Sequence, residues 1–136
     1  MANRISGLPG NDPLVKTEDG SFTVRHPVLN EAYHARQGAR AEAEVKFIGP
    51  TRLHDRLRQG PVRLLDIGFG LGINCRAALD CAEGAALQID TLELEPEALE
   101  RGLLVSPEDP MILSLIRTGQ FEGVQLHMGD LRQTLQ

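Results

Sequence analysis

The sequence predicts an α/β protein built on a parallel sheet, and three observations in its second half support this fold class. Short apolar runs at residues 62–67, 87–94 and 123–129 have the composition of strands that are covered by other structure. Segments typical of helices separate these runs, and this alternation is the order that right-handed crossovers produce. A glycine-rich turn follows the first run, where parallel sheets commonly bind ligands.

The chain before this sheet divides into two parts. Residues 1–16 are rich in Gly, Pro and Asn, which predicts a flexible tail. Residues 17–61 predict an N-terminal extension made of a hairpin and helices. Asp19-Gly20 lies between two extended stretches, which is a hairpin signal.

Two helices are expected in the rest of the extension. Residues 39–48 are rich in Ala and Glu, and Gly49-Pro50 is expected to stop the helix that they form. Residues 51–58 predict a second short helix, which Gly60-Pro61 closes.

Residues 62–136 contain the sheet and its helices. A helix over 73–82 is expected to end before Gly84. Pro96 suits the first position of the next helix, and residues 106–119 predict another, starting at the Ser-Pro-Glu of 106–108. A last helix is expected to begin at residue 130.

Composition excludes several classes of protein. The 136 residues are 41% apolar, which suits one domain, and no run of 18 or more apolar residues predicts a membrane span. The first residues lack the apolar region of a signal peptide. Cys75 and Cys81 fit no metal spacing and are expected to be reduced packing residues of a cytoplasmic protein. The four histidines show no metal-binding spacing either, so no metal is expected.

Charge is distributed unevenly along the chain. Residues 1–63 hold ten Lys or Arg and seven Asp or Glu, whereas residues 64–136 hold four and twelve. This pattern is consistent with an ordinary solvated surface, and also with an N-terminal part that faces a polyanion.

The turn "DIGFGLG" suggests which kind of ligand the sheet binds. Glycines at 68, 70 and 72 allow the backbone to approach a ligand, and the next helix offers free N–H groups. A dinucleotide fingerprint places its third glycine one residue later, and a pyrophosphate disfavours an acid such as Asp66. Asp66 suits a cationic amine, although it can also act as a turn or helix-capping acid.

Two further acids extend this pattern. Glu93 near the end of the second strand can bind both hydroxyls of a ribose, although it can also be a solvated residue with Glu95 as the binder. Asp130 can accept a hydrogen bond from the exocyclic amine of a base, or simply cap the last helix. Amine, ribose and adenine together describe S-adenosylmethionine.

These motifs resemble a known family. "DIGFGLG", "ELEP" and "GD" resemble the Rossmann-like, class I S-adenosylmethionine-dependent methyltransferases. The upstream segment "DGSFTVRHPVLNEAYHARQGARAEAEVKFI" resembles the MnmC-type tRNA methyltransferases in their stand-alone form. The resemblance implies methylation of the aminomethyl group of wobble uridine in tRNA, which completes 5-methylaminomethyl-2-thiouridine, with S-adenosylmethionine as cofactor and tRNA as partner.

The resemblance also implies roles for individual residues. Asp66 and the three glycines would surround the methionine part of the cofactor, and Glu93 would hold its ribose. Asp130 and Leu131 would lie at the adenine. The implied binding set also includes Phe69, Asn74 and Leu94, together with Tyr33, Gly38 and Glu42 from a segment near the cofactor mouth. No catalytic residue can be assigned.

The sequence departs from the family after "GDLRQTL". The family continues with a fourth strand and a D-x-F-x-P-like motif at the methyl acceptor, and neither is present here. The 62–67 strand is therefore expected to have a bare edge, which is a liability for pairing. We expect residues 62–136 to be the cofactor-binding half of a methyltransferase truncated after the third strand, with little activity alone and a possible partner chain at that edge.

Two other functions remain open from the sequence. One is a non-catalytic cofactor-binding or structural remnant that pairs with a partner chain. The other is a nicotinamide-dependent oxidoreductase, which the early third glycine and Asp66 disfavour.

Overall fold

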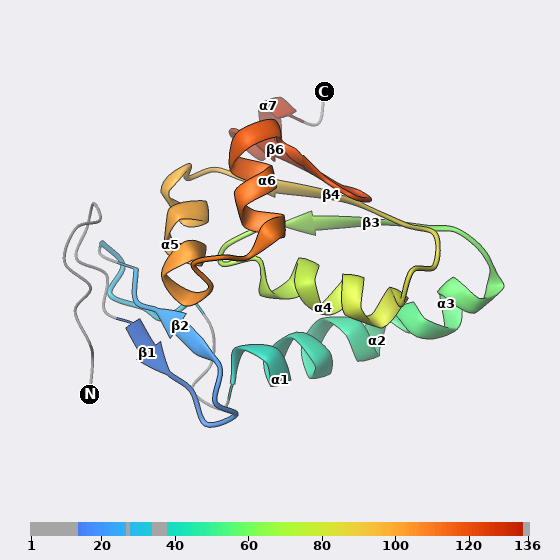
Figure 1. Ribbon diagram of the computed structural model, residues 1–136, viewed down its shortest axis with the longest axis horizontal. Helices are drawn as coiled ribbons and strands as arrows, with labels where there is room; N and C mark the ends of the chain where they lie inside the picture. Colours follow the sequence, from blue (N-terminus) through green and yellow to red (C-terminus); the bar gives the residue numbers. More distant parts are fainter. Residues whose placement is uncertain (1–13, 27, 34–37, 135–136) are drawn as a thin grey trace.

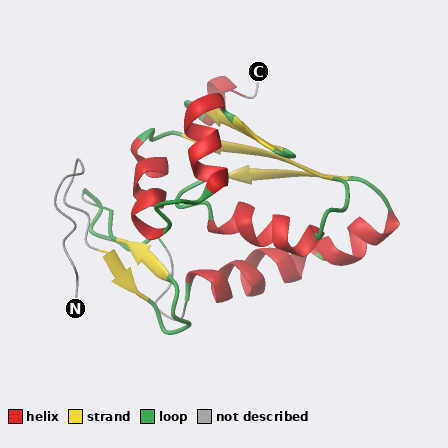
Figure 2. Ribbon diagram, in the orientation of Figure 1, coloured by secondary structure: helices red, strands yellow, loops and turns green. Residues whose placement is uncertain are grey.

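The fold is a four-stranded sheet with a layer of helices on it and a two-stranded hairpin at one end (Figure 1). The computed structural model describes residues 14–26, 28–33 and 38–134. A hairpin and a run of helices come first in the chain, and strands and helices alternate in its second half (Figure 2). The predicted fold class, α/β with a parallel sheet, is confirmed.

The sheet has the strand order β3-β4-β6-β5. β3 (Val62–Ile67), β4 (Leu87–Glu93) and β6 (Val124–Met128) are parallel, as predicted from their apolar runs. Their carboxyl ends therefore meet at one edge of the sheet, where a ligand site is expected.

One further strand of the sheet, the two-residue β5 (Gln120–Phe121), was not predicted. It pairs antiparallel with β6 across a tight turn in which Glu122 has a positive φ of 47°. Two residues are too few to produce an alternating pattern, so the sequence offers no strand signal there.

The core lies between one face of the sheet and the helices. Leu87 and Ile89 of β4 and Val124 of β6 project from this face and are at most 7% exposed. They pack with buried side chains of three helices, namely Cys75, Ala78, Ala82, Leu99, Met111, Ile112 and Leu115. The opposite face of β3 carries Leu65 and Ile67, which are 51% and 61% exposed.

The hairpin expected around Asp19-Gly20 is present. β1 (Leu14–Lys16) pairs antiparallel with β2 (Phe22–Val24), and Gly20 takes a positive φ of 85° in the turn. β1 occupies residues 14–16, which the sequence assigned to the tail. The remainder of the predicted tail, residues 1–13, lies outside the described residues.

The helix expected to stop at Gly49-Pro50 continues through it, and this prediction is wrong. α1 (Ala39–Ala43) runs into a π-helical segment, η1 (Glu44–Ile48), and then into α2 (Gly49–Thr51). The N–H of Gly49 bonds to Glu44 O, five residues back, so the hydrogen-bond register changes just before the proline. Pro50 has no N–H to satisfy, so it is tolerated in the first turn of α2.

The break comes at Arg52, which has a left-handed φ of 54°. α3 (Leu53–Gln59) then follows and ends at Gly60, as predicted. Leu53 is 1% exposed and anchors this helix in the core.

The helices on the sheet mostly match the sequence. α4 (Ile73–Ala82) and α5 (Glu97–Val105, after Pro96) lie where they were expected. α6 (Pro110–Thr118) begins four residues later than predicted, because the Asp109 carboxylate caps it by accepting from the N–H groups of Met111 and Ile112.

The chain then reaches α7 (Leu131–Thr134), the start of the last predicted helix. Residues 135–136 lie outside the described residues.

Candidate functional site

The glycine turn after β3 returns sharply toward the end of β4. The N–H groups of Gly68 and Phe69 both donate to the carbonyl of Leu92, at 2.8 and 3.0 Å. Gly68 has a φ of +86°, and a Cβ placed on it would meet nothing within 4 Å. The backbone at Gly68 is therefore open to a ligand.

Gly72 is explained by side-chain packing rather than by access for a ligand. A Cβ there would lie 2.7 Å from the Phe69 ring and 3.1 Å from the methyl group of Met111. Phe69 is 3% exposed and belongs to the core cluster. The packing of this ring already explains why position 72 is glycine, and Phe69 could reach a ligand only through its backbone.

Asp66 is buried at the end of β3, with 9% of its surface exposed. Its Oδ2 accepts hydrogen bonds from the Thr91 hydroxyl at 2.7 Å and from the Cys75 thiol at 3.3 Å. Burial raises the pKa of this carboxyl, and the two hydrogen bonds oppose that shift. These bonds fall on one oxygen, so the group retains acceptor capacity for a cationic amine.

Asn74 lies in the first turn of α4, directly after the glycine turn. Among the described residues, its Oδ1 is the buried side-chain oxygen or nitrogen that lacks a hydrogen-bond partner. Buried polar atoms are almost always paired, so this oxygen is available to a donor that the described residues do not supply.

Glu93 ends β4 and connects two loops. Its Oε1 accepts from the Gly70 N–H at 2.8 Å, and its Oε2 accepts from the Glu95 N–H at 3.0 Å. The residue is 9% exposed. Each oxygen keeps a further lone pair, so a carboxylate oriented in this way can still receive two hydroxyl donors.

A hollow of about 240 Å³ lies at the carboxyl ends of the strands. Leu94 and Leu131, which are 65% and 36% exposed, give it apolar walls. The full lining is Ile67, Gly68, Leu92, Glu93, Leu94, Gly129, Asp130 and Leu131. The hollow brings together five predicted residues from three separate loops, namely Gly68, Glu93, Leu94, Asp130 and Leu131. The predicted residues Asp66, Phe69, Gly70, Gly72 and Asn74 are not among those that line it, and Ile67, Leu92 and Gly129 line it without having been predicted.

Asp130 lies at the rim of this hollow and also caps α7. Its Oδ1 accepts from the backbone N–H of Arg132 at 2.8 Å, and its Oδ2 pairs with the Arg132 guanidinium at 2.6 Å. These hydrogen bonds from Arg132 lower the pKa of Asp130. Of the two roles considered for Asp130, capping is the one that the described contacts display.

Tyr33 reaches the glycine turn from the N-terminal extension. Its ring lies 3.5 Å from where a Cβ of Gly70 would be, and its hydroxyl accepts a hydrogen bond from Arg101 at 2.9 Å. Arg101 also pairs with Glu95 at 3.0 Å, and Glu95 in turn lies 3.0 Å from His26 Nε2. The extension is therefore tied to the β4–α5 loop.

The contacts of Glu95 with His26 and Arg101 indicate which of the two acids, Glu93 or Glu95, faces the hollow. The hydrogen bond from His26, and then that from Arg101, lower the pKa of Glu95. The Glu95 carboxylate is engaged with the extension, whereas Glu93 lines the hollow. The geometry therefore favours Glu93 over Glu95 as the residue that meets a ligand.

Gly38 and Glu42 make contacts at the junction of the hairpin with α1. A Cβ on Gly38 would collide with the Asp19 carboxylate, and Glu42 pairs with Lys46 at 3.7 Å. Their placement is explained by the local packing of the extension, and a role at the cofactor mouth stays a prediction.

Sequence reasoning missed the partners that hold the site acids. Thr91 is the register partner of Asp66 in the β3–β4 pair, so aligning the two strands could have found it. Cys75 was predicted only as a packing residue, and both cysteines are free. The hydrogen bond between His26 and Glu95 joins residues 69 positions apart, and that between Arg101 and Tyr33 joins residues 68 positions apart. The sequence carries no signal for pairs so distant.

Two kinds of feature are absent from the residues that the structure describes. No group of three or more His, Cys, Asp or Glu there is arranged to hold a metal ion. Nor does any helix in that part of the chain have the length and apolar character needed to cross a membrane.

The chain is similar to proteins that are much longer. No protein-family model matches it. Uncharacterized protein MJ0670 of Methanocaldococcus jannaschii is 30% identical over 143 residues, which cover 95% of this chain and 39% of that protein. The crystal structure of MnmC2 from Aquifex aeolicus superposes with a TM-score of 0.64 and 26% identity, over 90% of this chain and 44% of the other.

A weaker likeness is to the SAH-bound methyltransferase PaMTH1 of Podospora anserina, with a TM-score of 0.44 and 17% identity over 87% of this chain and 47% of that one. The fold is the Rossmann-like fold of class I methyltransferases, as the sheet topology and the agreement with MnmC2 show. The chain spans less than half the length of these proteins.

Proposed function

We propose that this chain binds S-adenosylmethionine and forms the cofactor-binding part of a methyltransferase. The observation that carries the proposal is Glu93, which two backbone N–H groups orient beside the hollow and the open backbone of Gly68. A fixed acid at the end of the second parallel strand is suited to the two hydroxyls of a ribose. The class I methyltransferase fold supports the same conclusion.

The other parts of the cofactor find complementary groups around Glu93. Asp66 and the orphaned Oδ1 of Asn74 supply acceptors for the amine of the methionine part. The exposed Leu94 and Leu131 supply apolar contacts for the faces of the adenine. The acceptor group of Asp130 lies at the same rim, where it would share its oxygens between Arg132 and the base.

The finer proposal concerns the methyl acceptor. We infer that the acceptor is the aminomethyl group of wobble uridine in tRNA, as in the MnmC-type family. The likeness to MnmC2 extends over 90% of this chain, so it includes the N-terminal extension as well as the sheet. Bound S-adenosylmethionine supplies an electrophilic methyl group, and the amine must be neutral to attack it. The group that removes the amine's proton stays unassigned.

Calorimetric titration of the protein with S-adenosylmethionine tests the cofactor proposal, and NADH serves as the competing ligand. The Glu93→Gln variant replaces one acceptor oxygen with a donor and removes the charge. Losing a charged hydrogen bond costs about 1.5–3 kcal/mol, so affinity should fall roughly 10- to 150-fold.

Glu97→Gln, on the exposed first turn of α5, is the matched control and should bind like the unaltered protein. Tight NADH binding, or S-adenosylmethionine binding that Glu93→Gln leaves unchanged, would contradict the proposal. The tRNA proposal has its own test, which is the transfer of labelled methyl groups to tRNA that carries 5-aminomethyl-2-thiouridine.

A further inference from the structure

Asp66 lies at the end of β3 without a cationic partner among the described residues. Its two side-chain hydrogen bonds come from the Thr91 hydroxyl at 2.7 Å and the Cys75 thiol at 3.3 Å, and both reach Oδ2. All three side chains are buried. A hydroxyl and a thiol are neutral donors, so the negative charge of this carboxylate is hydrogen-bonded but not neutralised.

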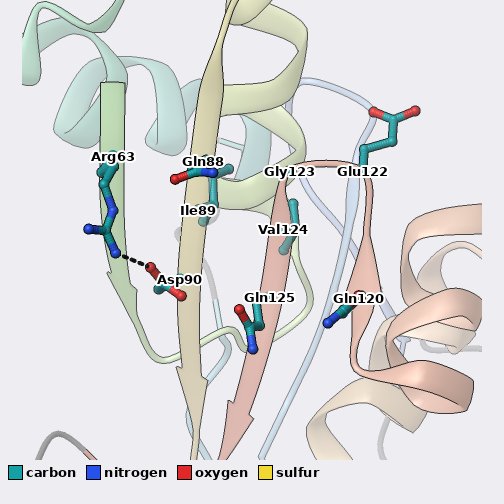
Figure 3. Close-up of a pocket in the computed structure, with 9 residues that line it drawn as sticks. All are labelled: Arg63, Gln88, Ile89, Asp90, Gln120, Glu122, Gly123, Val124 and Gln125. Atoms are coloured by element: carbon teal, nitrogen blue, oxygen red, sulfur yellow. Dashed lines mark ion pairs between the residues drawn. The ribbon is translucent and has the colours of Figure 1, made fainter. Parts of the chain in front are cut away.

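Asp90 on β4 shows the opposite arrangement. Arg63 of β3 points toward its carboxylate and lies 3.6 Å from one oxygen (Figure 3). His127 of β6 lies 2.9 Å from the other oxygen. The hydrogen bond from His127 lowers the pKa of Asp90, whereas burial raises the pKa of Asp66. A cation that reached Asp66 would offset this effect of burial, so Asp66 is suited to a charged ligand in a way that Asp90 is not.

The two donors that hold Asp66 come from different elements. Thr91 is its register partner in the β3–β4 pair, and Cys75 lies in the first turn of α4, directly after the glycine turn. Because both donors meet the same oxygen, the carboxylate cannot turn out of its present plane without weakening both hydrogen bonds. Oδ1 accepts no hydrogen bond from the described residues, so it is the oxygen left for a ligand.

Asn74, the residue before Cys75, provides a second open acceptor. Its Oδ1 is buried and also lacks a hydrogen-bond partner among the described residues. A primary ammonium group has three N–H donors and no acceptor, so it matches two open oxygens, whereas a carboxylate has no donor and a hydroxyl has one. The open acceptors of Asp66 and Asn74 are therefore complementary to a cationic amine.

We propose that Thr91 and Cys75 are positioning residues that make the site selective for the amine of S-adenosylmethionine. They hold Asp66 by its Oδ2, and its Oδ1 receives the ammonium group of the ligand. Neither residue touches the ligand, because each acts through the Asp66 carboxylate. This role deepens the proposed function and rests on it.

Three ligands that differ at the amino-acid end test the proposal by calorimetry at neutral pH. S-adenosylhomocysteine carries the amine and a carboxylate, its decarboxylated form carries the amine alone, and methylthioadenosine carries neither. All three share the adenosine and an uncharged sulfur, so contacts with the adenine and the ribose, including those of Glu93, are common to the set. An effect that is confined to the first two ligands is therefore an effect on the amine.

Substitutions at Thr91 remove and then restore the stronger of the two donors. Thr91→Val removes the hydroxyl and keeps the shape of the side chain. It should weaken the binding of both amine-bearing ligands roughly 2- to 12-fold, which corresponds to one hydrogen bond, and leave that of methylthioadenosine unchanged. Thr91→Ser restores the hydroxyl and should restore both affinities.

A second variant and a control make the test specific. Cys75→Ala should give a smaller loss of the same kind, since a thiol is a weak donor, and it provides the test if Thr91→Val does not fold. Thr118→Val is the matched control at the end of α6, where it removes a hydroxyl that bonds to the carbonyl groups of Ser114 and Gln120. It should bind all three ligands like the unaltered protein.

The pH profile of binding is a readout that a purely structural role would not change. The ammonium group binds the ionised form of Asp66, so affinity should fall as the pH falls through the pKa of this carboxyl. Burial raises that pKa, the hydrogen bonds from Thr91 and then Cys75 oppose the rise, and the charge of Glu93 adds to it. Removing either donor should therefore move the midpoint of the loss to higher pH. Methylthioadenosine, measured over the same range, corrects for the protonation of Glu93.

Each contrary outcome has a distinct meaning. Equal losses for all three ligands in Thr91→Val and Cys75→Ala would show general structural damage and overturn the proposal. Unchanged affinity for the amine-bearing ligands, or a midpoint that does not move, would overturn it as well. If the unaltered protein binds methylthioadenosine as tightly as S-adenosylhomocysteine, the cofactor site stands and the selectivity for the amine is refuted. If it binds none of the three, the proposed function fails and this inference fails with it.

Discussion

Substituting alanine for glycine in the turn after β3 should separate packing from backbone strain. Gly72 and Gly84 have almost the same backbone conformation, with φ of 81° and 84°. Left-handed backbone costs a residue with a Cβ about 1–2 kcal/mol, and alanine recovers about 0.4–1 kcal/mol by restricting the unfolded chain. These two contributions are common to both sites.

The sites differ in the space that they offer. A Cβ at Gly84 meets nothing within 4 Å, whereas at Gly72 it lies 2.7 Å from Phe69 and 3.1 Å from Met111. Forcing a methyl group into a packed core costs about 1–3 kcal/mol more. Gly72→Ala should therefore lower the free energy of unfolding by about 1–3 kcal/mol more than Gly84→Ala does.

Urea unfolding followed by circular dichroism measures this difference, with equal m-values as the check that both variants unfold from the same compact state. Gly68→Ala completes the set, because its Cβ is also unobstructed. It should match Gly84→Ala in stability yet weaken S-adenosylmethionine binding. Equal losses at positions 72 and 84 would refute the view that Phe69 and Met111 dictate glycine at position 72.

Four further changes test the contacts around the site. Thr91→Val removes the donor of the 2.7 Å bond to Asp66 and should cost about 1–3 kcal/mol of stability in urea titrations at pH 7, whereas no loss would show that the bond is dispensable. Because burial raises the pKa of Asp66, stability should fall as the pH rises from the ordinary value of 3.8 through the raised pKa, and Asp66→Asn should remove that fall in thermal scans. Since the pKa of Glu95 is lowered, its stabilising contribution is present above 4.5 and is lost as the pH falls, so Glu95→Gln should be less sensitive to acid, and an unaltered acid profile would contradict this. Tyr33→Phe keeps the ring but loses the hydroxyl's hydrogen bond, and should cost about 0.5–1.5 kcal/mol in the same assay.

The parallel strands were predictable because their local pattern and the fold agree. The apolar runs of β3, β4 and β6 and the terminating glycines are local features, and the structure places these elements where they were expected. Predictions were wrong where two local signals compete. At the start of α6, both Ser106 and Asp109 are good capping residues, and the second one is used.

The candidate site was predictable only in part. The positions of Gly68 and Glu93 follow from where parallel strands end, so sequence reasoning could place them at one rim. The direction in which a side chain points depends on its neighbours in space. Asp66 turns toward Thr91 on the next strand, and Asp130 turns back to Arg132, and neither choice is determined by the residue's own position in the chain.

The tether between the N-terminal extension and the β4–α5 loop has a consequence for synthesis on the ribosome. His26 and Glu95 are 69 positions apart, so His26 cannot make this contact until 69 further residues have been synthesised. At about 5–20 residues per second, this wait lasts roughly 3–14 s. Ala39, Ala43 and Leu53, all at most 1% exposed in the finished fold, lack part of their cover during that interval. The N-terminal extension is therefore synthesised early and completed late, and its apolar side chains are open to aggregation and proteolysis during that interval.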